Sequence, residues 1–264
     1  MICWVVERTL AARNVSHAIV ATDDQRIADA VKAAGFEAVV TGAHHQSGTD
    51  RIAEVAVSIE DADIIVNVQG DEPLISPLTI ERAVEAMGEE GNWGKGQGVN
   101  ENGEIGEKGK GERENDQVGI VTTWEAIESA ADVLNPDVVK IVVDERGRAI
   151  YFSRLPVPYP RDAVRRHGSI EVAILKEPGL VANFRKHTGL YVYRRDVLLE
   201  FAKWPQSELE RLESLEQLRA LEHGVKIKAI KASTSSIGVD TVADLERVRG
   251  MVKEVSSFEF QVSS

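Results

Sequence analysis

Two acidic residues stand where a metal ion or a phosphate group would bind. Asp71 belongs to the segment VNVQGDEP (residues 66–73) and follows a β-branched apolar run, which predicts a buried parallel strand. In open α/β sheets, ligands bind outside the carboxyl ends of the strands, so Asp71 is well placed for that chemistry. Gly-Asp is also common in surface turns, and an ordinary turn is the alternative interpretation.

Asp240 is the second of these acidic residues. It follows Gly238, which permits close backbone approach, and it precedes a predicted helix, so it could equally be the N-cap of that helix. Mg²⁺ commonly binds through one or two carboxylates together with substrate phosphates. Asp71 and Asp240 together therefore predict a Mg²⁺ site, with helix capping as the alternative role of Asp240.

The segment HHQSGTDR (residues 44–51) leads into another predicted helix. Free N–H groups at a helix N-terminus bind anions, and Ser47 and Gly48 are small enough to let a ligand approach. A plain capping loop needs the same residue types. His44 and His45 are adjacent, and we expect their side chains to point apart, so the segment does not favour a zinc site.

His187 and Tyr191 lie four residues apart near a predicted strand. Side chains four apart on a strand share one face, so these two could converge on one ligand. A half-buried strand with polar tips is the plainer interpretation. Glu216 and Gln217 lie beside a leucine stripe in a predicted helix over residues 207–222. Polar residues beside such a stripe usually form its solvated face.

Strands and helices alternate through the first third of the chain, which indicates βαβ crossovers and a mostly parallel sheet. The predicted helices there span residues 2–13, 25–34, 50–58 and 78–87, and the predicted strands span residues 17–21, 37–41 and 61–69. The second half predicts a hairpin of residues 138–143 and 148–152, strands over 190–194 and 226–230, and a closing helix over 241–255.

Residues 88–117 break this alternation. They are rich in Gly, Glu, Lys and Asn and contain almost nothing apolar, so burial cannot offset their ordering entropy. We interpret them as a disordered and dispensable surface insertion within one domain that spans residues 1–264.

Composition limits the classes of function. The 264 residues are 43% hydrophobic, enough for one large α/β domain or for a domain with a smaller lobe. The net charge of −12 disfavours broad binding to nucleic acid or anionic membranes. Cys3 is the only cysteine, which excludes a disulfide framework within the chain. No apolar run approaches the roughly 20 residues of a membrane helix, and no signal segment opens the chain, so we expect a cytoplasmic protein without membrane insertion.

Eight segments, taken in order, resemble the 3-deoxy-manno-octulosonate (KDO) cytidylyltransferases, the CMP-KDO synthetases of Gram-negative lipopolysaccharide biosynthesis. The resemblance runs from Met1 to about Val252 and is interrupted only by residues 88–117. The eight segments are ATDD (21–24), HHQSGTDR (44–51), VNVQGDEP (66–73), NPDVVKIV (135–142), YFSR (151–154), HTGLYVYRR (187–195), LESLEQLRAL (212–221) and GVDTVADLERV (238–248).

The resemblance implies a fold, a reaction and partners. The fold is α/β, with a three-layer, mostly parallel sheet of the nucleotide-diphospho-sugar transferase type and a smaller β-rich lobe for dimerisation and sugar binding. The reaction is CTP + KDO → CMP-KDO + pyrophosphate, dependent on Mg²⁺ and carried out by a homodimer. Activation of another acidic sugar, such as a sialic acid, and a catalytically impaired truncated paralogue are the alternatives.

The resemblance also implies roles for the residues at matching positions. Asp71 and Asp240 would hold the metal and, with Arg154, take part in catalysis. The nucleotide set comprises Ala21, Asp23, Ser47, Gly48, Arg51 and Gln69, of which Gln69 also faces the sugar acid. The sugar set comprises Arg154, His187, Tyr191, Glu216 and Gln217. A guanidinium fork such as that of Arg154 suits the carboxylate of KDO.

One departure from the family concerns the start of the chain. Members of the family begin with an apolar strand and a loop with an Arg and a Lys that grips the triphosphate, whereas this sequence begins at the first predicted helix. The resemblance therefore leads us to expect that these 264 residues alone bind CTP weakly and turn over slowly, either because the start site was assigned too far downstream or because the chain is a decayed paralogue.

Overall fold

The computed structural model describes residues 1–45, 47–89, 117–236, 238–239 and 241–251. Asp240 and nearly all of the predicted insertion, residues 88–117, therefore lie outside the described residues. The chain divides into two compact units. Unit 1 comprises residues 1–59, 67–82 and 233–264, and unit 2 comprises residues 60–66 and 83–232. β3 (Ile64–Asn67) and α4 (Pro77–Glu89) each have residues in both units.

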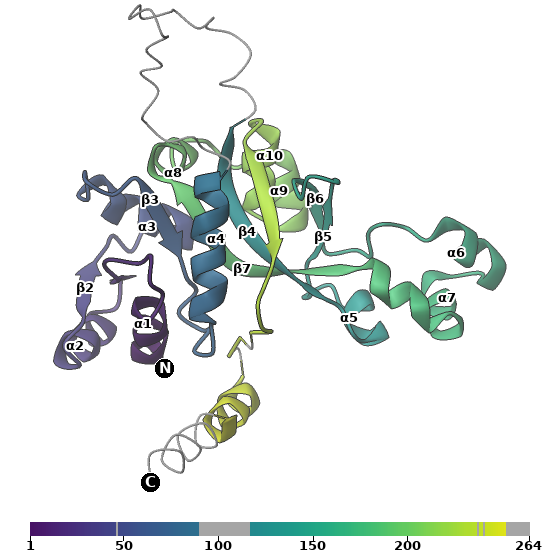
Figure 1. Cartoon of the computed structure of the whole chain (residues 1–264), viewed down its shortest axis with the longest axis horizontal. Helices are drawn as coiled ribbons and strands as arrows, with labels where there is room; N and C mark the ends of the chain where they lie inside the picture. Colours follow the sequence, from purple (N-terminus) through teal and green to yellow (C-terminus); the bar gives the residue numbers. More distant parts are fainter. Residues whose placement is uncertain (46, 90–116, 237, 240, 252–264) are drawn as a thin grey trace, which may run out of the picture. The chain divides into compact units, whose positions relative to one another are not determined.

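Unit 1 is built on a small parallel sheet. β1 and β2 pair in register from Ile19 opposite Glu37 to Thr22 opposite Val40, and α2 connects them (Figure 1). Val6, Val20, Ala28, Val31 and Ala38 form the core beneath these elements. The elements are α1 (Ile2–Leu10), β1 (Ile19–Thr22), α2 (Gln25–Ala33), β2 (Glu37–Val40) and α3 (Gly48–Val57), and residues 242–251 are also helical.

The ends of α2 follow from local sequence. The side chain of Asp24 accepts a hydrogen bond from the main-chain N–H of Arg26 and so caps the helix. Gly35 has a φ of +86°, a conformation that glycine adopts without the penalty other residues incur, and it reverses the chain toward β2. The predicted strand–helix–strand order of this region is confirmed.

Unit 2 contains a six-stranded mixed sheet. The strand order is β6-β5-β7-β4-β8, and β3 pairs with β7 off this path. β4 pairs parallel with β8, but β4–β7, β5–β6 and β5–β7 are antiparallel. The α/β class is confirmed, whereas the expectation of a mostly parallel sheet is wrong for unit 2. The strands are β4 (Val118–Ala126), β5 (Lys140–Val143), β6 (Ala149–Ser153), β7 (Arg185–Arg194) and β8 (Lys226–Lys231).

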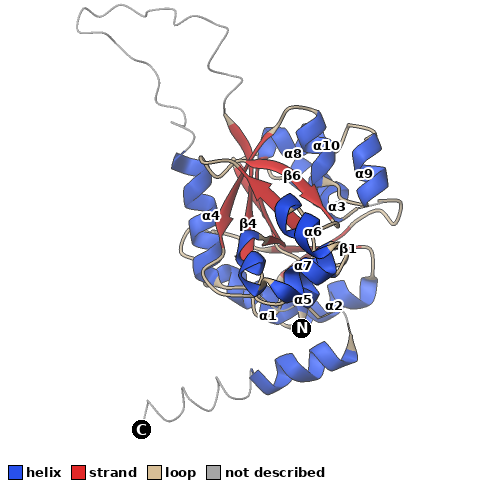
Figure 2. Cartoon of the chain, turned by 90° about the vertical axis from the view of Figure 1, so that its right-hand side faces the viewer, coloured by secondary structure: helices blue, strands red, loops and turns tan. Residues whose placement is uncertain are grey.

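The helices of unit 2 form two groups. α5, α7 and the 3₁₀ helix η2 share a small core of Ile127, Val133, Ile174 and Phe184, and α6 packs against α7. α10 packs against β6 and β8, and the helices, blue in Figure 2, flank the red strands. The bounds are α5 (Ala130–Leu134), α6 (Arg161–His167), α7 (Ile170–Lys176), η2 (Pro178–Asn183), α8 (Arg195–Phe201), α9 (Glu208–Glu213) and α10 (Gln217–Glu222).

The predicted single helix over residues 207–222 is wrong. Ser207 caps α9 in a capping box with Glu210, but the helix ends at Ser214, which has a left-handed φ of +51°. The leucine pattern does not mark one buried face, because Leu212 of α9 is 75% exposed whereas Leu215 and Leu218 are buried. The main-chain carbonyls of Glu213 and Ser214 are used elsewhere, as hydrogen-bond acceptors for Arg154.

Some elements carried no recognised signal in the sequence. β4 is buried at nearly every position, so it lacks the alternation by which a half-buried strand is identified. α5 to α8 are each seven residues or shorter, which is too short for a clear helical period. Within the part of the chain that the structure describes, no helix is long and apolar enough to cross a membrane.

Candidate functional site

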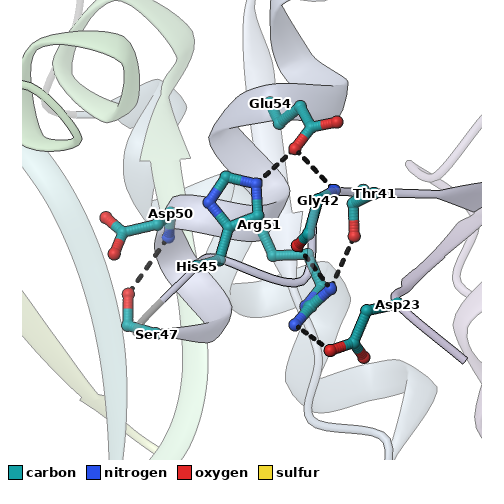
Figure 3. Close-up of polar contacts among 8 residues, drawn as sticks. All are labelled: Asp23, Thr41, Gly42, His45, Ser47, Asp50, Arg51 and Glu54. Carbon is teal, nitrogen blue, oxygen red and sulfur yellow. Dashed lines mark hydrogen bonds and ion pairs between the residues drawn. The ribbon is translucent and has the colours of Figure 1, made fainter.

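Arg51 is the centre of a polar network in unit 1. It lies near the start of α3 and points back toward the ends of β1 and β2 (Figure 3). Its guanidinium donates to Thr41 Oγ1 at 2.6 Å and lies 3.2 Å from Asp23 Oδ2. The Arg51 side chain is only 17% exposed, whereas that of Asp23 is 44% exposed. The structure therefore brings Asp23 and Arg51, two members of the predicted nucleotide set, into direct contact.

The loop before α3 is fixed by two further contacts. Ser47 Oγ accepts a hydrogen bond from the main-chain N–H of Asp50 at 3.1 Å, so Ser47 is the N-cap and Gly48 is the first helical residue. Glu54 accepts from the main-chain N–H of Gly42 at 3.2 Å and pairs with His45 Nε2. Because of these two partners the pKa of Glu54 is lowered, the contact with His45 having the larger effect.

One expectation about this loop is wrong. The rings of His44 and His45 lie with centroids 4.4 Å apart and do not point away from each other. The pairing of His45 with Glu54 keeps that ring on the α3 side of the loop (Figure 3).

Asp71 is half-buried and follows Gly70 at the end of the segment after β3. Its main-chain carbonyl accepts a hydrogen bond from the N–H of Val239 at 2.9 Å, so residue 239 lies beside it within unit 1. Among the described residues, no group of three or more His, Cys, Asp or Glu side chains is arranged to hold a metal. Such a cluster is not required for Mg²⁺, which takes one or two carboxylates, substrate phosphates and water.

The two remaining members of the nucleotide set lie on the same unit. Ala21 is in β1 opposite Val39, two residues before Asp23. Gln69 is half-buried, and its main-chain carbonyl accepts from the N–H of Glu72 at 3.2 Å, which starts the turn that contains Asp71. All members of the nucleotide set thus belong to unit 1.

His187 and Tyr191 converge in unit 2, as the strand spacing predicts. Their ring centroids lie 5.3 Å apart, and the His187 ring also meets Phe152 of β6 edge-on at 5.0 Å. Burial lowers the pKa of His187 to about 3, so the imidazole is neutral at pH 7. Burial, together with Tyr193 and Glu216, raises the pKa of Tyr191 well above its ordinary value.

Arg154 follows β6 and is held by the chain around it. Its Nε donates to the carbonyl of Glu213 at 2.7 Å, Nη1 to the carbonyl of Pro136 at 3.0 Å and Nη2 to the carbonyl of Ser214 at 3.3 Å. Its main-chain N–H donates to the Glu213 carboxylate at 2.9 Å. A guanidinium has five N–H groups, so two have no bond to the described residues and are available to a ligand.

Lys140 supports this arrangement, and its role was not predicted from the sequence. Its side chain is fully buried, and Nζ donates to the main-chain carbonyls of Asn135, Val138 and Arg154 at 2.7–2.8 Å. Burial and the neighbouring Arg154 lower the pKa of Lys140. The only sequence signal was a lysine inside the apolar run VVKIVV, which is rare unless the charge is satisfied.

Gln217 and Glu216 are not on a solvated face. Gln217 is 5% exposed, and its Nε2 has no hydrogen-bond partner among the described residues. Glu216 is half-buried at the start of α10. A buried amide without a partner costs free energy, so a ligand that accepts a hydrogen bond would satisfy Gln217. Every member of the sugar set lies in unit 2.

Comparison with known proteins identifies the family of the chain. The chain matches the family model described as cytidylyltransferase over residues 1–227. It therefore belongs to the cytidylyltransferase family, whose members are nucleotidyltransferases. The 3-deoxy-manno-octulosonate cytidylyltransferase of Trichlorobacter lovleyi is 44% identical over 254 residues, which cover 96% of this chain and 88% of that protein. The protein of the same name from Geobacter sulfurreducens is also 44% identical, over 96% of this chain and 89% of the relative.

A solved structure gives the same result at the level of the fold. The structure of a CMP:2-keto-3-deoxy-manno-octonic acid synthetase complexed with CTP is 38% identical to this chain. It matches with a TM-score of 0.74 over 96% of this chain and 87% of that one. The predicted nucleotidyltransferase fold is thereby confirmed.

Proposed function

We propose that this protein activates KDO by transferring the cytidylyl group of CTP to it, releasing pyrophosphate and forming CMP-KDO. The observation that carries the proposal is the match, over nearly the whole chain, to relatives named 3-deoxy-manno-octulosonate cytidylyltransferase. The two residue sets support it, because one set suits an anionic nucleotide and the other an acidic sugar.

The nucleotide set would bind CTP in unit 1. The N-terminus of α3 offers main-chain N–H groups, and Gly48 leaves space for a ligand to approach them. Arg51 is positioned by Asp23 and Thr41, so little side-chain freedom is lost when a ligand binds.

The sugar set would bind KDO in unit 2. Arg154 has two N–H groups left to pair with the carboxylate, and the pairing of a guanidinium fork with a carboxylate is strong and directional. His187 is neutral and Gln217 is a buried donor, so both suit the hydroxyl groups of a sugar.

The reaction itself needs positioning more than covalent chemistry. The anomeric hydroxyl of KDO would attack the α-phosphorus of CTP in line with the departing pyrophosphate oxygen. Asp71 and Asp240 would hold Mg²⁺, and the contact between Val239 and the Asp71 carbonyl supports this pairing. When bound, Mg²⁺ would neutralise charge on the phosphate oxygens.

Three wider features belong to the same proposal. We place the reaction in the cytoplasm, where CTP is made, and assign its product to lipopolysaccharide biosynthesis. We also propose a homodimer. Light scattering on the protein as it elutes from a size-exclusion column gives its molar mass and so tests the dimer directly. A mass of one chain, 28.9 kDa, would contradict the dimer.

Pyrophosphate release measured with CTP and a panel of sugar acids tests the main proposal. We expect turnover with KDO and little with a sialic acid. Strong turnover with a sialic acid and none with KDO would show that the substrate is a different acidic sugar. No turnover with any sugar acid would mean that the chain is a catalytically impaired member of the family.

A further inference from the structure

Thr122 makes a contact with His187 that fixes more than the position of the ring. It lies in β4, is fully buried, and is paired across the sheet with Tyr191. Its hydroxyl Oγ1 lies 2.9 Å from His187 Nε2 and 2.9 Å from the carbonyl oxygen of Leu190. A third contact, to the carbonyl of Thr188, is 3.5 Å long and correspondingly weak.

An irregularity in the sheet creates this arrangement. The pairing of β4 with β7 passes from Thr122 opposite Tyr191 to Thr123 opposite Thr188, so Gly189 and Leu190 lie between paired positions. A bulge of this kind re-aims nearby groups, and bulges are common next to functional sites. Here the Leu190 carbonyl and the His187 ring both meet the one hydroxyl of Thr122.

Counting protons assigns the donor in each contact. A carbonyl oxygen can only accept, so the single proton of the Thr122 hydroxyl is donated to Leu190. The Thr122 oxygen is then an acceptor toward His187, and Nε2 of the ring must carry the proton. With the opposite tautomer, one hydroxyl proton would have to serve two acceptors, each 2.9 Å away.

The second ring nitrogen is therefore an acceptor. Because burial keeps the imidazole neutral, Nδ1 carries a lone pair and no proton. The contact with Thr122 is the only hydrogen bond of the His187 ring within the described part of the chain. Nδ1 is thus left to accept a hydrogen bond from a bound molecule.

We propose that Thr122 is a positioning residue that determines sugar specificity: it holds His187 as the Nε2–H tautomer, so that Nδ1 accepts a hydrogen bond from a hydroxyl of the sugar acid. This inference rests on the proposed function, because it takes the sugar acid as the molecule bound at His187. It divides the recognition of the substrate into two tasks. His187 selects a hydroxyl donor and repels a carboxylate, while the carboxylate pairs with Arg154.

Nitrogen-15 NMR of the histidine rings tests the tautomer without any turnover. The His187 signals are identified by their loss in His187→Gln, and we expect a protonated Nε2 and an unprotonated Nδ1 in the wild-type protein. Thr122→Ser keeps the hydroxyl and should keep this pattern. A protonated Nδ1 in the wild-type protein would overturn the proposal, whether or not any variant folds.

Kinetics with a matched control test the role in specificity. Thr122→Val is nearly isosteric and removes the hydroxyl, so the KM for KDO should rise about three- to tenfold, the loss expected for one hydrogen bond, while the KM for CTP stays unchanged. Thr123→Val is the control, since Thr123 is 1% exposed on the same strand and its hydroxyl contacts Thr188 instead. Thr122→Ser should restore the KM.

The outcomes separate this inference from the proposed function. Turnover of KDO with an equal KM in the wild-type protein and in Thr122→Val would overturn the role of Thr122 alone. Equal changes of the KM for KDO in Thr122→Val and Thr123→Val would show that Thr122 has only a structural role. Wild-type protein that turns over no sugar acid would overturn both proposals.

Discussion

In unit 1 the residues assigned to the nucleotide lie near the ends of short strands, in the loops that follow them and in the first turn of α3. In unit 2 the residues assigned to the sugar lie on a long strand, past a hairpin end and at a helix break. The first set contains a contact between charged side chains, that of Asp23 with Arg51. In the second set, the neutral ring of His187 contacts the hydroxyl of Thr122, 65 positions away in the sequence.

The difference extends to the surroundings of the charges. Asp23 and Glu54 are each more than 40% exposed, so water screens their interactions. Lys140 and Gln217 are buried, and the groups around Lys140 are main-chain carbonyls. The residues assigned to the nucleotide therefore include solvent-exposed charges, whereas those assigned to the sugar lie among buried polar groups, of which Gln217 Nε2 has no partner among the described residues.

Replacing the proposed metal ligand of unit 1 should have the largest effect. Asp71→Asn keeps the shape of the side chain and removes its charge, so we expect the turnover number to fall by more than about a hundredfold at saturating CTP, KDO and Mg²⁺. Asp240→Asn should behave in the same way. Asp61→Asn changes an exposed aspartate and should leave turnover unchanged. An Asp240→Asn protein that only melts earlier would identify Asp240 as a helix cap.

Removing the buried lysine of unit 2 should destabilise the protein without changing the residues of the nucleotide set. Lys140→Met leaves the carbonyls of Asn135, Val138 and Arg154 without their donor, and we expect the free energy of unfolding to fall by about 3 kcal/mol. Urea titration measures this quantity. Lys226→Met, at an exposed position of β8, is the matched control. Equal stability of the two variants would show that the three carbonyls need no donor.

The buried His187 should make stability depend on pH. Its pKa is about 3 in the folded protein and about 6.5 in an unfolded chain, so below pH 6.5 the unfolded chain takes up the proton first. Stability should therefore fall with decreasing pH, by about 2 kcal/mol between pH 6.5 and pH 5. In His187→Gln this contribution should vanish. Parallel pH profiles in the two proteins would argue against a buried neutral imidazole.

The smallest effect concerns the cap of α3. Ser47→Ala should lower the free energy of unfolding by about 1 kcal/mol, as the loss of an N-cap does, and should also raise the KM for CTP. Ser129→Ala removes the equivalent cap of α5 and should cost similar stability with no change in KM. An equal change of the KM for CTP in both variants would mean that Ser47 acts only as a cap.

Sequence patterns predicted the parts of the molecule that are set by neighbouring residues. Asp24 as the cap of α2, Gly35 at its end and the β5–β6 hairpin with Gly147 at φ +79° each follow from a few adjacent positions. The convergence of His187 and Tyr191 followed from strand geometry alone.

Residues whose role depends on strand pairing were not predictable in the same way. Thr122 meets His187 across 65 positions of sequence, and a threonine in a strand is unremarkable by itself. The break at Ser214 runs against a continuous leucine pattern, because Arg154 takes up the carbonyls of residues 213 and 214. Tertiary contacts override local propensity at these positions.

The most direct test of the division between the units compares two arginines. The KM values for CTP and KDO are measured in Arg51→Met and Arg154→Met, with the exposed Arg82→Met as control. We expect Arg51→Met to raise the KM for CTP about tenfold or more and leave that for KDO within about twofold, and Arg154→Met to do the reverse. Both variants raising both KM values to the same extent would contradict the assignment of the two substrates to separate residue sets.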